Sequence, residues 1–283
     1  MPRRAFRLAY DGHPFYGFQR QPTVPTVEDA LFAACSELGI AEGVPDGYAA
    51  AGRTDAGVSA LAQTLTLEVP DWCSPHALNG RLPDSMGLWA SAEVPPDFHA
   101  THDAAERRYD YFLHAGGLDG DRVRTAAAVL AGEHDFADLT TDDDGTVREL
   151  SIECAETGAF LRLTVRAGGF PRGLVRRLAE LLREIGAGEA PPSKAERVVG
   201  PEPVTGGEGV PPAPPGPLVL ADVTYPGVAF RVEDRAARRC RRLFDDRSRA
   251  LAGRARALEG VVDGIGATDR RGSDDEDDGT APT

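Results

Sequence analysis

Residues 50–60 read Ala50-Ala51-Gly52-Arg53-Thr54-Asp55-Ala56-Gly57-Val58-Ser59-Ala60. They place one carboxylate, Asp55, beside an arginine and a threonine, and between two glycines that let the backbone turn and a ligand approach closely. Such a carboxylate is a candidate nucleophile or acid/base, and the nearby Arg53 would favour its charged form. Aspartate beside glycine is also common in polar turns, which it caps through its own backbone. On the chemistry of this stretch alone, the ordinary turn is the simpler interpretation.

The sequence around this stretch predicts a loop held by a sheet. Residues 5–10 alternate as a strand that ends at a turn, and a helix begins after Thr26. Residues 47–51 lead into the loop, and residues 65–69 alternate in a strand that leaves it. Asp55 is therefore expected on a connection between two sheet elements, where function is commonly carried.

The rest of the chain repeats this mixture of strands and helices without a sequence repeat. Further strands are expected near residues 88–94, 108–113, 150–152, 161–165 and 218–225, and helices over 74–78, 123–130, 171–185 and after 235. Residues 186–217 are rich in Gly, Pro and Glu and are expected to form a loop or linker. We predict an α+β fold of two similar α/β-type halves, with a mixed, largely antiparallel sheet and a central cleft.

Three parts are expected along the chain. Residues 1–104 would form an N-terminal domain that carries the Asp55 loop, and residues 105–260 a C-terminal domain that completes the cleft. Residues 261–283 would form an acidic disordered tail. No apolar run reaches the length of a membrane span and no hydrophobic signal region opens the chain, so a soluble cytoplasmic protein is expected.

Charge is unevenly distributed in the sequence. The chain has 31 Lys and Arg against 45 Asp and Glu, a net charge of −14, and Lys194 is its one lysine. Such a balance suits a salt-rich cytoplasm and counts against RNA binding unless the basic residues cluster. They do cluster in residues 235–256, where nine arginines meet two acids. This segment is either a contact for RNA phosphates or an ordinary exposed helix. The four scattered cysteines do not match a metal or redox motif, so no metal is expected.

Several motifs in a fixed order resemble one known family. They are Ala9-Tyr10-Asp11-Gly12, Tyr16-Gly17-Phe18-Gln19-Arg20-Gln21, Arg53-Thr54-Asp55-Ala56-Gly57-Val58, Asn79 with Leu82-Pro83, Phe98-His99-Ala100, Arg107-Arg108-Tyr109-Asp110-Tyr111, Gly132-Glu133-His134-Asp135-Phe136 and Val175-Arg176. The ordered set is similar to the TruA family of tRNA pseudouridine synthases. The resemblance implies isomerisation of uridine to pseudouridine at positions 38 to 40 of the anticodon stem-loop, without a cofactor.

The same resemblance implies roles for four side chains. Asp55 would be the nucleophile, or the group that starts glycosidic cleavage. Tyr109 would stack on the flipped uridine, although alternation alone would make it a core aromatic. Arg176 would be a partner of Asp55, and Arg53 would neutralise an RNA phosphate or fill the space left by the flipped base. The family also implies a homodimer that shares one tRNA.

Departures from the family pattern, at Ser59, Thr101, Pro171 and Leu174, leave alternatives open. Ser59 stands where the family often has His, and Thr101 where an arginine is usual. A noncatalytic RNA-binding protein on the same fold is therefore an alternative. A carboxylate hydrolase such as a nucleosidase is a further one, but it would need a second acid or base near Asp55.

Overall fold

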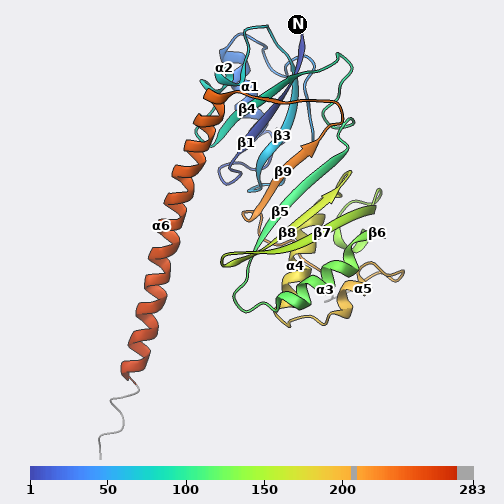
Figure 1. The fold of residues 1–283 in the computed structure, drawn as a ribbon, viewed down its shortest axis with the longest axis vertical. Coiled ribbons are helices and arrows are strands. Elements are labelled where there is room, and N and C mark those ends of the chain that lie inside the picture. The colour runs from blue at the N-terminus through green and yellow to red at the C-terminus, as the bar shows by residue number, and fades with distance from the viewer. Residues whose placement is uncertain (205–208, 273–283) are drawn as a thin grey trace, which may run out of the picture. The chain divides into compact units, whose positions relative to one another are not determined.

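The computed structural model describes residues 1–204 and 209–272, with side chains up to residue 265 (Figure 1). Contacts separate one compact unit, Met1–Cys240, from a second unit, Arg241–Thr283. The expected boundary between residues 104 and 105 falls inside the first unit, in the connection between the fourth and fifth strands, and it stays a prediction.

The first unit is built on one open, mixed sheet of ten strands. The strands are β1 (Arg3–Tyr10), β2 (Ala49–Ala50), β3 (Ser59–Glu68), β4 (Met86–Glu93), β5 (Glu106–His114), β6 (Gly132–Asp135), β7 (Val147–Thr157), β8 (Phe160–Ala167), β9 (Leu218–Thr224) and β10 (Arg231–Val232). Their order is β10-β4-β1-β3-β9-β5-β8-β7-β6, and β2 pairs with β3. The pair β3–β9 is parallel and the other described pairs are antiparallel, so the predicted α+β class with a largely antiparallel sheet is confirmed.

The first unit also contains helices. They are α1 (Val27–Glu37), α2 (Pro75–Asn79), α3 (Gly120–Leu130), α4 (Leu174–Gly186), α5 (Ser193–Arg197) and the first turns of α6 (Asp234–Gly272). The Thr26 side chain caps α1 by accepting from the Asp29 amide, and Ser74 caps α2 in the same way. No helix in the described part of the chain is long and apolar enough to cross a membrane.

Three expectations about element boundaries need correction. Helix α4 begins at Leu174 rather than near residue 171, because Gly173 takes a left-handed conformation with φ of 73° that ends the preceding turn. Residues 186–217 include the short helix α5. Helix α6 continues through Gly272, so residues 261–272 are helical rather than part of a tail, while residues 273–283 lie outside the described residues.

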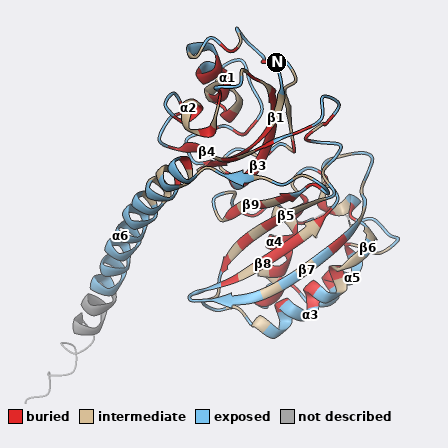
Figure 2. Cartoon of the chain, turned by 45° about the horizontal axis from the view of Figure 1, so that its top comes forward, coloured by how far each residue is buried: buried red, intermediate tan, exposed pale blue. Residues whose placement is uncertain are grey.

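The register of the three middle strands brings two distant segments together. Ala60, just after the Asp55 loop, pairs with Leu220 of β9, and Leu220 pairs with Tyr109 of β5. On β5, Tyr109, Tyr111 and Leu113 are buried and their neighbours are less so (Figure 2). This alternation matches the one expected from the sequence. The Asp55 loop and the middle of β5 therefore meet across the centre of the sheet.

Candidate active site

The Asp55 loop joins β2 to β3 and is fixed by hydrogen bonds on both sides. The Phe18 amide donates to the Thr54 carbonyl at 3.1 Å, and the Tyr10 and Thr54 hydroxyls lie 2.8 Å apart. Both hydroxyl-bearing side chains are buried. At the start of the loop, the Gln63 side-chain amide donates to the Gly52 carbonyl at 2.8 Å. The backbone that carries Asp55 is therefore anchored to the core.

Two glycines make the tight turn at this loop possible. Gly57 has φ of +80°, and a Cβ added there would lie 3.0 Å from the Pro215 ring. Gly12 lies against the loop so closely that an added Cβ would be 2.2 Å from the Val58 carbonyl oxygen. A side chain at either position would displace the backbone next to Asp55, because the left-handed region and such short contacts exclude one.

Arg176 provides the positive charge that contacts Asp55. Its Nη1 lies 3.1 Å from Asp55 Oδ2, and its Nε donates to the Ala213 carbonyl at 2.7 Å. The Asp55 side chain is 39% exposed and that of Arg176 17%. A guanidinium held by a second acceptor presents its remaining donors in a fixed direction. The carboxylate is thus oriented from α4 while it stays open to the cavity.

Tyr109 is an almost buried aromatic side chain beside this ion pair. Its ring packs edge-on against Phe170, with centroids 5.2 Å apart and an interplanar angle of 88°. Burial, opposed by Arg107 and reinforced by the charge of Asp55, raises the pKa of Tyr109 to about 12. At neutral pH its phenol is therefore a neutral hydrogen-bond donor.

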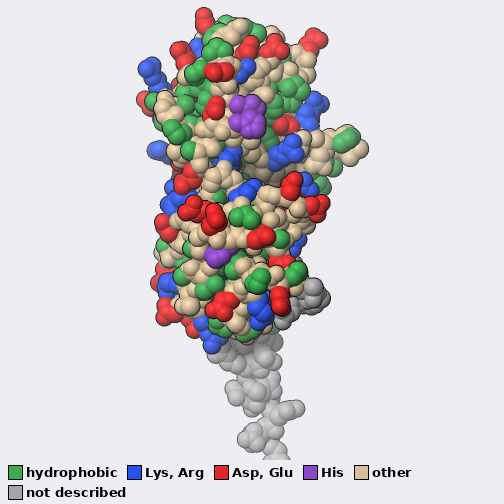
Figure 3. Space-filling model, turned by 90° about the vertical axis from the view of Figure 1, so that its right-hand side faces the viewer, with side chains coloured by type: hydrophobic (Ala, Val, Ile, Leu, Met, Phe, Trp, Pro, Cys, Tyr) green, Lys and Arg blue, Asp and Glu red, His purple; other side chains and the backbone are tan. Residues whose placement is uncertain are grey.

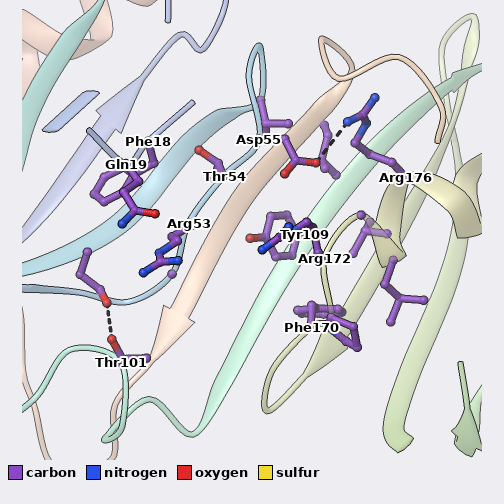
Figure 4. A pocket seen from close by; sticks show the side chains of 18 of the residues that line it. Phe18, Gln19, Arg53, Thr54, Asp55, Thr101, Tyr109, Phe170, Arg172 and Arg176 are labelled. Carbon is purple, nitrogen blue, oxygen red and sulfur yellow. Dashed lines mark hydrogen bonds and ion pairs between the residues drawn. The ribbon is translucent and has the colours of Figure 1, made fainter. Parts of the chain in front are cut away.

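A cavity of about 660 Å³ joins these side chains. It is lined by the Asp55 loop, by Tyr109 and by the segment before and at the start of α4, and Figure 4 shows Asp55 and Arg176 on one side with Tyr109 next to them. Arg53 also lines the cavity, apart from the ion pair, and its side chain is exposed. All four residues expected at the site thus line one cavity. The arginine that pairs with Asp55 is Arg176, which is distant in the sequence, rather than Arg53, which is two residues away. Among the described residues, no group of three or more His, Cys, Asp or Glu side chains is placed to hold a metal ion.

The sequence did not predict roles for Phe170 and Arg107. Phe170 follows the Gly168-Gly169 pair and contacts Tyr109. Arg107 donates to the Ala51 carbonyl from Nε at 3.0 Å and from Nη2 at 2.7 Å, to Thr101 O at 2.7 Å, and to Gly168 O. It therefore ties three cavity-forming segments together through their backbones. Arg107 stands two residues before Tyr109 in the same strand, and this position on the same strand face was the one sequence feature that could have placed it near the site.

Ser59 and Thr101, two of the departures from the family pattern, make internal hydrogen bonds. The Gly12 amide donates to Ser59 Oγ at 3.1 Å, and Thr101 Oγ1 donates to the Ala50 carbonyl at 2.5 Å. Both support the backbone around the Asp55 loop. Neither side chain replaces Asp55, Tyr109 or Arg176.

Comparisons with known proteins point to one family. A family model described as tRNA pseudouridine synthase matches residues 126–226. The tRNA pseudouridine synthase A of Haloarcula marismortui is 51% identical over 93% of this chain and 100% of its own length. That of Natronomonas pharaonis is 54% identical over 89% of this chain and 96% of its own. Among solved structures, the archaeal box H/ACA sRNP Nop10-Cbf5 complex is similar at a TM-score of 0.32 and 18% identity, over 62% of this chain and 45% of that one, which is too low to support an inference.

The identity to these relatives extends over 93% and 89% of this chain. The chain therefore belongs to the TruA family of tRNA pseudouridine synthases, and it is an isomerase.

Proposed function

We propose that the enzyme converts uridines 38 to 40 of the tRNA anticodon stem-loop to pseudouridine, with Asp55 as the nucleophile. The observation that carries the proposal is the ion pair between Asp55 and Arg176 at 3.1 Å, in a cavity that also holds Tyr109. A charged carboxylate fixed by a guanidinium keeps one oxygen free to attack an electrophilic carbon. Residues 1–104 contribute Asp55 and residues 105–260 contribute Arg176, so both parts are needed for the reaction.

The reaction is an isomerisation, so its atoms balance within the nucleotide. The bond between ribose C1′ and uracil N1 breaks, the base turns, and a bond forms between C1′ and C5. C5 then loses its proton and N1 gains one. Asp55 attack on C1′, attack on C6, or an elimination begun by Asp55 are all compatible with this balance.

A uridine in a stem or stacked loop must leave its stack before its sugar and base can meet Asp55. Tyr109 offers a flat apolar surface inside the cavity, and Phe170 fixes the orientation of its ring. The exposed Arg53 and Arg172, which also line the cavity, are suited to hold backbone phosphates of the flipped nucleotide.

Replacing Tyr109 separates a stacking role of its ring from a role of its hydroxyl group. Tyr109→Phe keeps the ring and is expected to retain most of the turnover, whereas Tyr109→Leu removes the stacking surface. Base stacking on an aromatic ring is worth roughly 1–3 kcal/mol, so Tyr109→Leu is expected to lower kcat/KM by roughly 5- to 150-fold. Rates of pseudouridine formation for both variants check this. Equal, large losses in the two variants would assign the essential role to the phenol hydroxyl instead.

Position specificity is tested with tRNA transcripts that keep a single uridine at 38, 39 or 40 and carry cytidine at the other two. Each transcript is expected to yield pseudouridine at the one of these three positions that still carries uridine. Efficient modification of a uridine outside the anticodon stem-loop, with none at these three positions, would contradict the proposed specificity. Binding of the transcripts with no product from any uridine would favour the noncatalytic RNA-binding alternative.

We further propose that the enzyme acts in a salt-rich cytoplasm, as a homodimer. The relatives named above come from halophilic archaea, and the chain carries a net charge of −14. Acidic and basic side chains are interspersed on the face shown in Figure 3. Dimerisation would let two subunits share one tRNA.

Salt is expected to stabilise the folded protein. A large net charge of one sign destabilises the compact state by self-repulsion, and salt at molar concentration shortens the Debye length from about 10 Å to about 3 Å. The melting temperature of the purified protein is therefore expected to rise between roughly 0.1 M and molar KCl. Thermal melts followed by circular dichroism check this, and a melting temperature that is unchanged or lower in molar KCl would contradict a salt-adapted protein.

A further inference from the structure

The second unit of the chain carries an exposed apolar stripe on α6. Side chains at intervals of four and three residues fall on one face of the helix, in the order Phe244, Ser248, Leu251, Ala255, Leu258, Val262 and Ile265. The large ones beyond residue 250 are exposed: Leu251 61%, Leu258 59%, Val262 68% and Ile265 67%. An alternation of four and three is the a/d pattern of a two-stranded coiled coil, with Leu251 and Leu258 at d positions.

The first turns of α6 are covered. Within the first unit Ala236 is fully buried, and Cys240 lies against β4, with its Sγ 3.5 Å from the Leu88 carbonyl oxygen. The row of positions four residues apart continues from Cys240 to Phe244, where the stripe begins, and Ser248 is the polar member of the stripe.

Glycines make α6 a weak helix without a partner. Gly253, Gly260 and Gly264 lie on the side opposite the stripe, and each costs about 1 kcal/mol relative to alanine in a helix interior. Helix stability in proteins comes mainly from packing of an apolar face. An uncovered stripe on a glycine-containing helix is thus stabilised most by a partner that covers it.

We propose that a second copy of this chain covers the stripe, and that two α6 helices form a parallel coiled coil. The flanking charges favour this orientation. With Leu251 and Leu258 at d, Arg254 falls at g and Glu259 at the following e position, so a parallel pair places Arg254 of each chain beside Glu259 of the other. An antiparallel pair centred on the stripe would instead bring the two copies of Arg254 together.

The charges of α6 favour this partner over tRNA. Of the nine arginines in residues 235–256, at least four already pair with acids: Arg238 with Asp234, Arg239 with Asp84, Arg249 with Asp245 and Asp246, and Arg256 with Glu259. Molar salt also weakens phosphate contacts steeply but leaves apolar contacts intact. The parallel coiled coil of two α6 helices would be a contact surface of the homodimer proposed above, and the inference rests on that proposal.

The test is the mass of the full-length protein in molar KCl, measured by light scattering without tRNA. Wild-type protein is expected at twice the chain mass of 30.1 kDa, and Leu251→Asp/Leu258→Asp at the single mass. The matched control Ala250→Asp/Ala257→Asp adds the same charges at the same spacing, one residue off the stripe, and is expected to remain dimeric. Circular dichroism melts of both variants establish that the first unit stays folded.

Orientation is tested by oxidation of single-cysteine variants. Ser248→Cys lies at an a position away from the centre of the stripe and is expected to form a disulfide between chains in a parallel, in-register pair, whereas an antiparallel pair centred on the stripe would keep the two introduced thiols apart. Ala257→Cys, off the stripe, is the control, and wild-type protein reports any background from Cys35, Cys73, Cys154 and Cys240.

Two results would overturn the proposal: a monomeric wild type, or a stripe variant that stays dimeric. A stripe variant that stays dimeric and loses tRNA affinity would assign the segment to RNA. Pseudouridine assays on the same samples test the proposed reaction separately from the coiled coil. A protein that is dimeric but forms no pseudouridine would contradict only the proposed reaction.

Discussion

Replacing Asp55 with asparagine is expected to abolish pseudouridine formation and to leave tRNA binding intact. Asparagine keeps the size of the side chain and can still accept the hydrogen bond from Arg176, so the cavity keeps its shape. It removes the negative charge that attacks carbon or starts glycosidic cleavage. Loss of a nucleophile commonly lowers kcat by about 10⁴-fold or more, and a fall of this size is expected here. Release of tritium from tRNA labelled at uracil C5 gives the rate, and a binding titration gives the affinity.

The control for this change is Asp71→Asn, which removes one exposed carboxylate that does not line the cavity. It is expected to match wild type in both rate and affinity. An Asp55→Asn variant that loses binding together with turnover would make Asp55 a binding residue. One that keeps turnover would remove Asp55 from the reaction.

Replacing Arg176 with alanine is expected to lower kcat roughly 10- to 150-fold, with a smaller change in tRNA affinity. The guanidinium bonds both Asp55 Oδ2 and the Ala213 carbonyl, and a hydrogen bond to a charged group is worth about 1.5–3 kcal/mol. Without it the carboxylate is free to rotate away from the reacting atom. Arg176→Lys is expected to be intermediate, because one ammonium group lacks the planar fork that reaches both acceptors. Single-turnover rates with saturating enzyme measure the effect.

Arg183→Ala is the matched control on the same helix. Arg183 pairs with Glu180 and Glu189 away from the cavity, so its loss is expected to leave the single-turnover rate unchanged. If Arg176→Ala raised KM alone, Arg176 would be a tRNA contact and would not position Asp55. Equal losses in the Arg176 and Arg183 variants would indicate a general effect on α4.

Local sequence signals predicted most of the elements of this fold. The Thr26 and Ser74 caps and the alternation on β5 predicted the starts of two helices and the buried face of a strand, because each rests on interactions within a few residues. The start of α4 was misplaced because Pro171 is compatible with a first helical turn, and the left-handed conformation of Gly173 decides the boundary instead. The short strands β6 and β10 carry too few residues to show a period.

The site itself depends on contacts that no local pattern encodes. Asp55 and Arg176 are 121 residues apart, and from spacing alone Arg53 was the natural partner of the carboxylate. The pairing of β3 with β9 and of β9 with β5 decides that Tyr109 lies next to the Asp55 loop. The ordered family motifs identified these residues and implied that Arg176 is the partner of Asp55, while the role of Arg107 follows from the fold.

The central claim is that Asp55 reacts with a flipped uridine in the cavity that it shares with Arg176 and Tyr109. Its most direct test is the mapping of pseudouridine in unmodified tRNA after incubation with purified wild-type protein or Asp55→Asn, side by side in molar KCl. Pseudouridine is expected in the anticodon stem-loop with wild type and at no position with the variant. Pseudouridine formed by Asp55→Asn at the wild-type rate would contradict the claim, as would tRNA left unmodified by the wild-type protein.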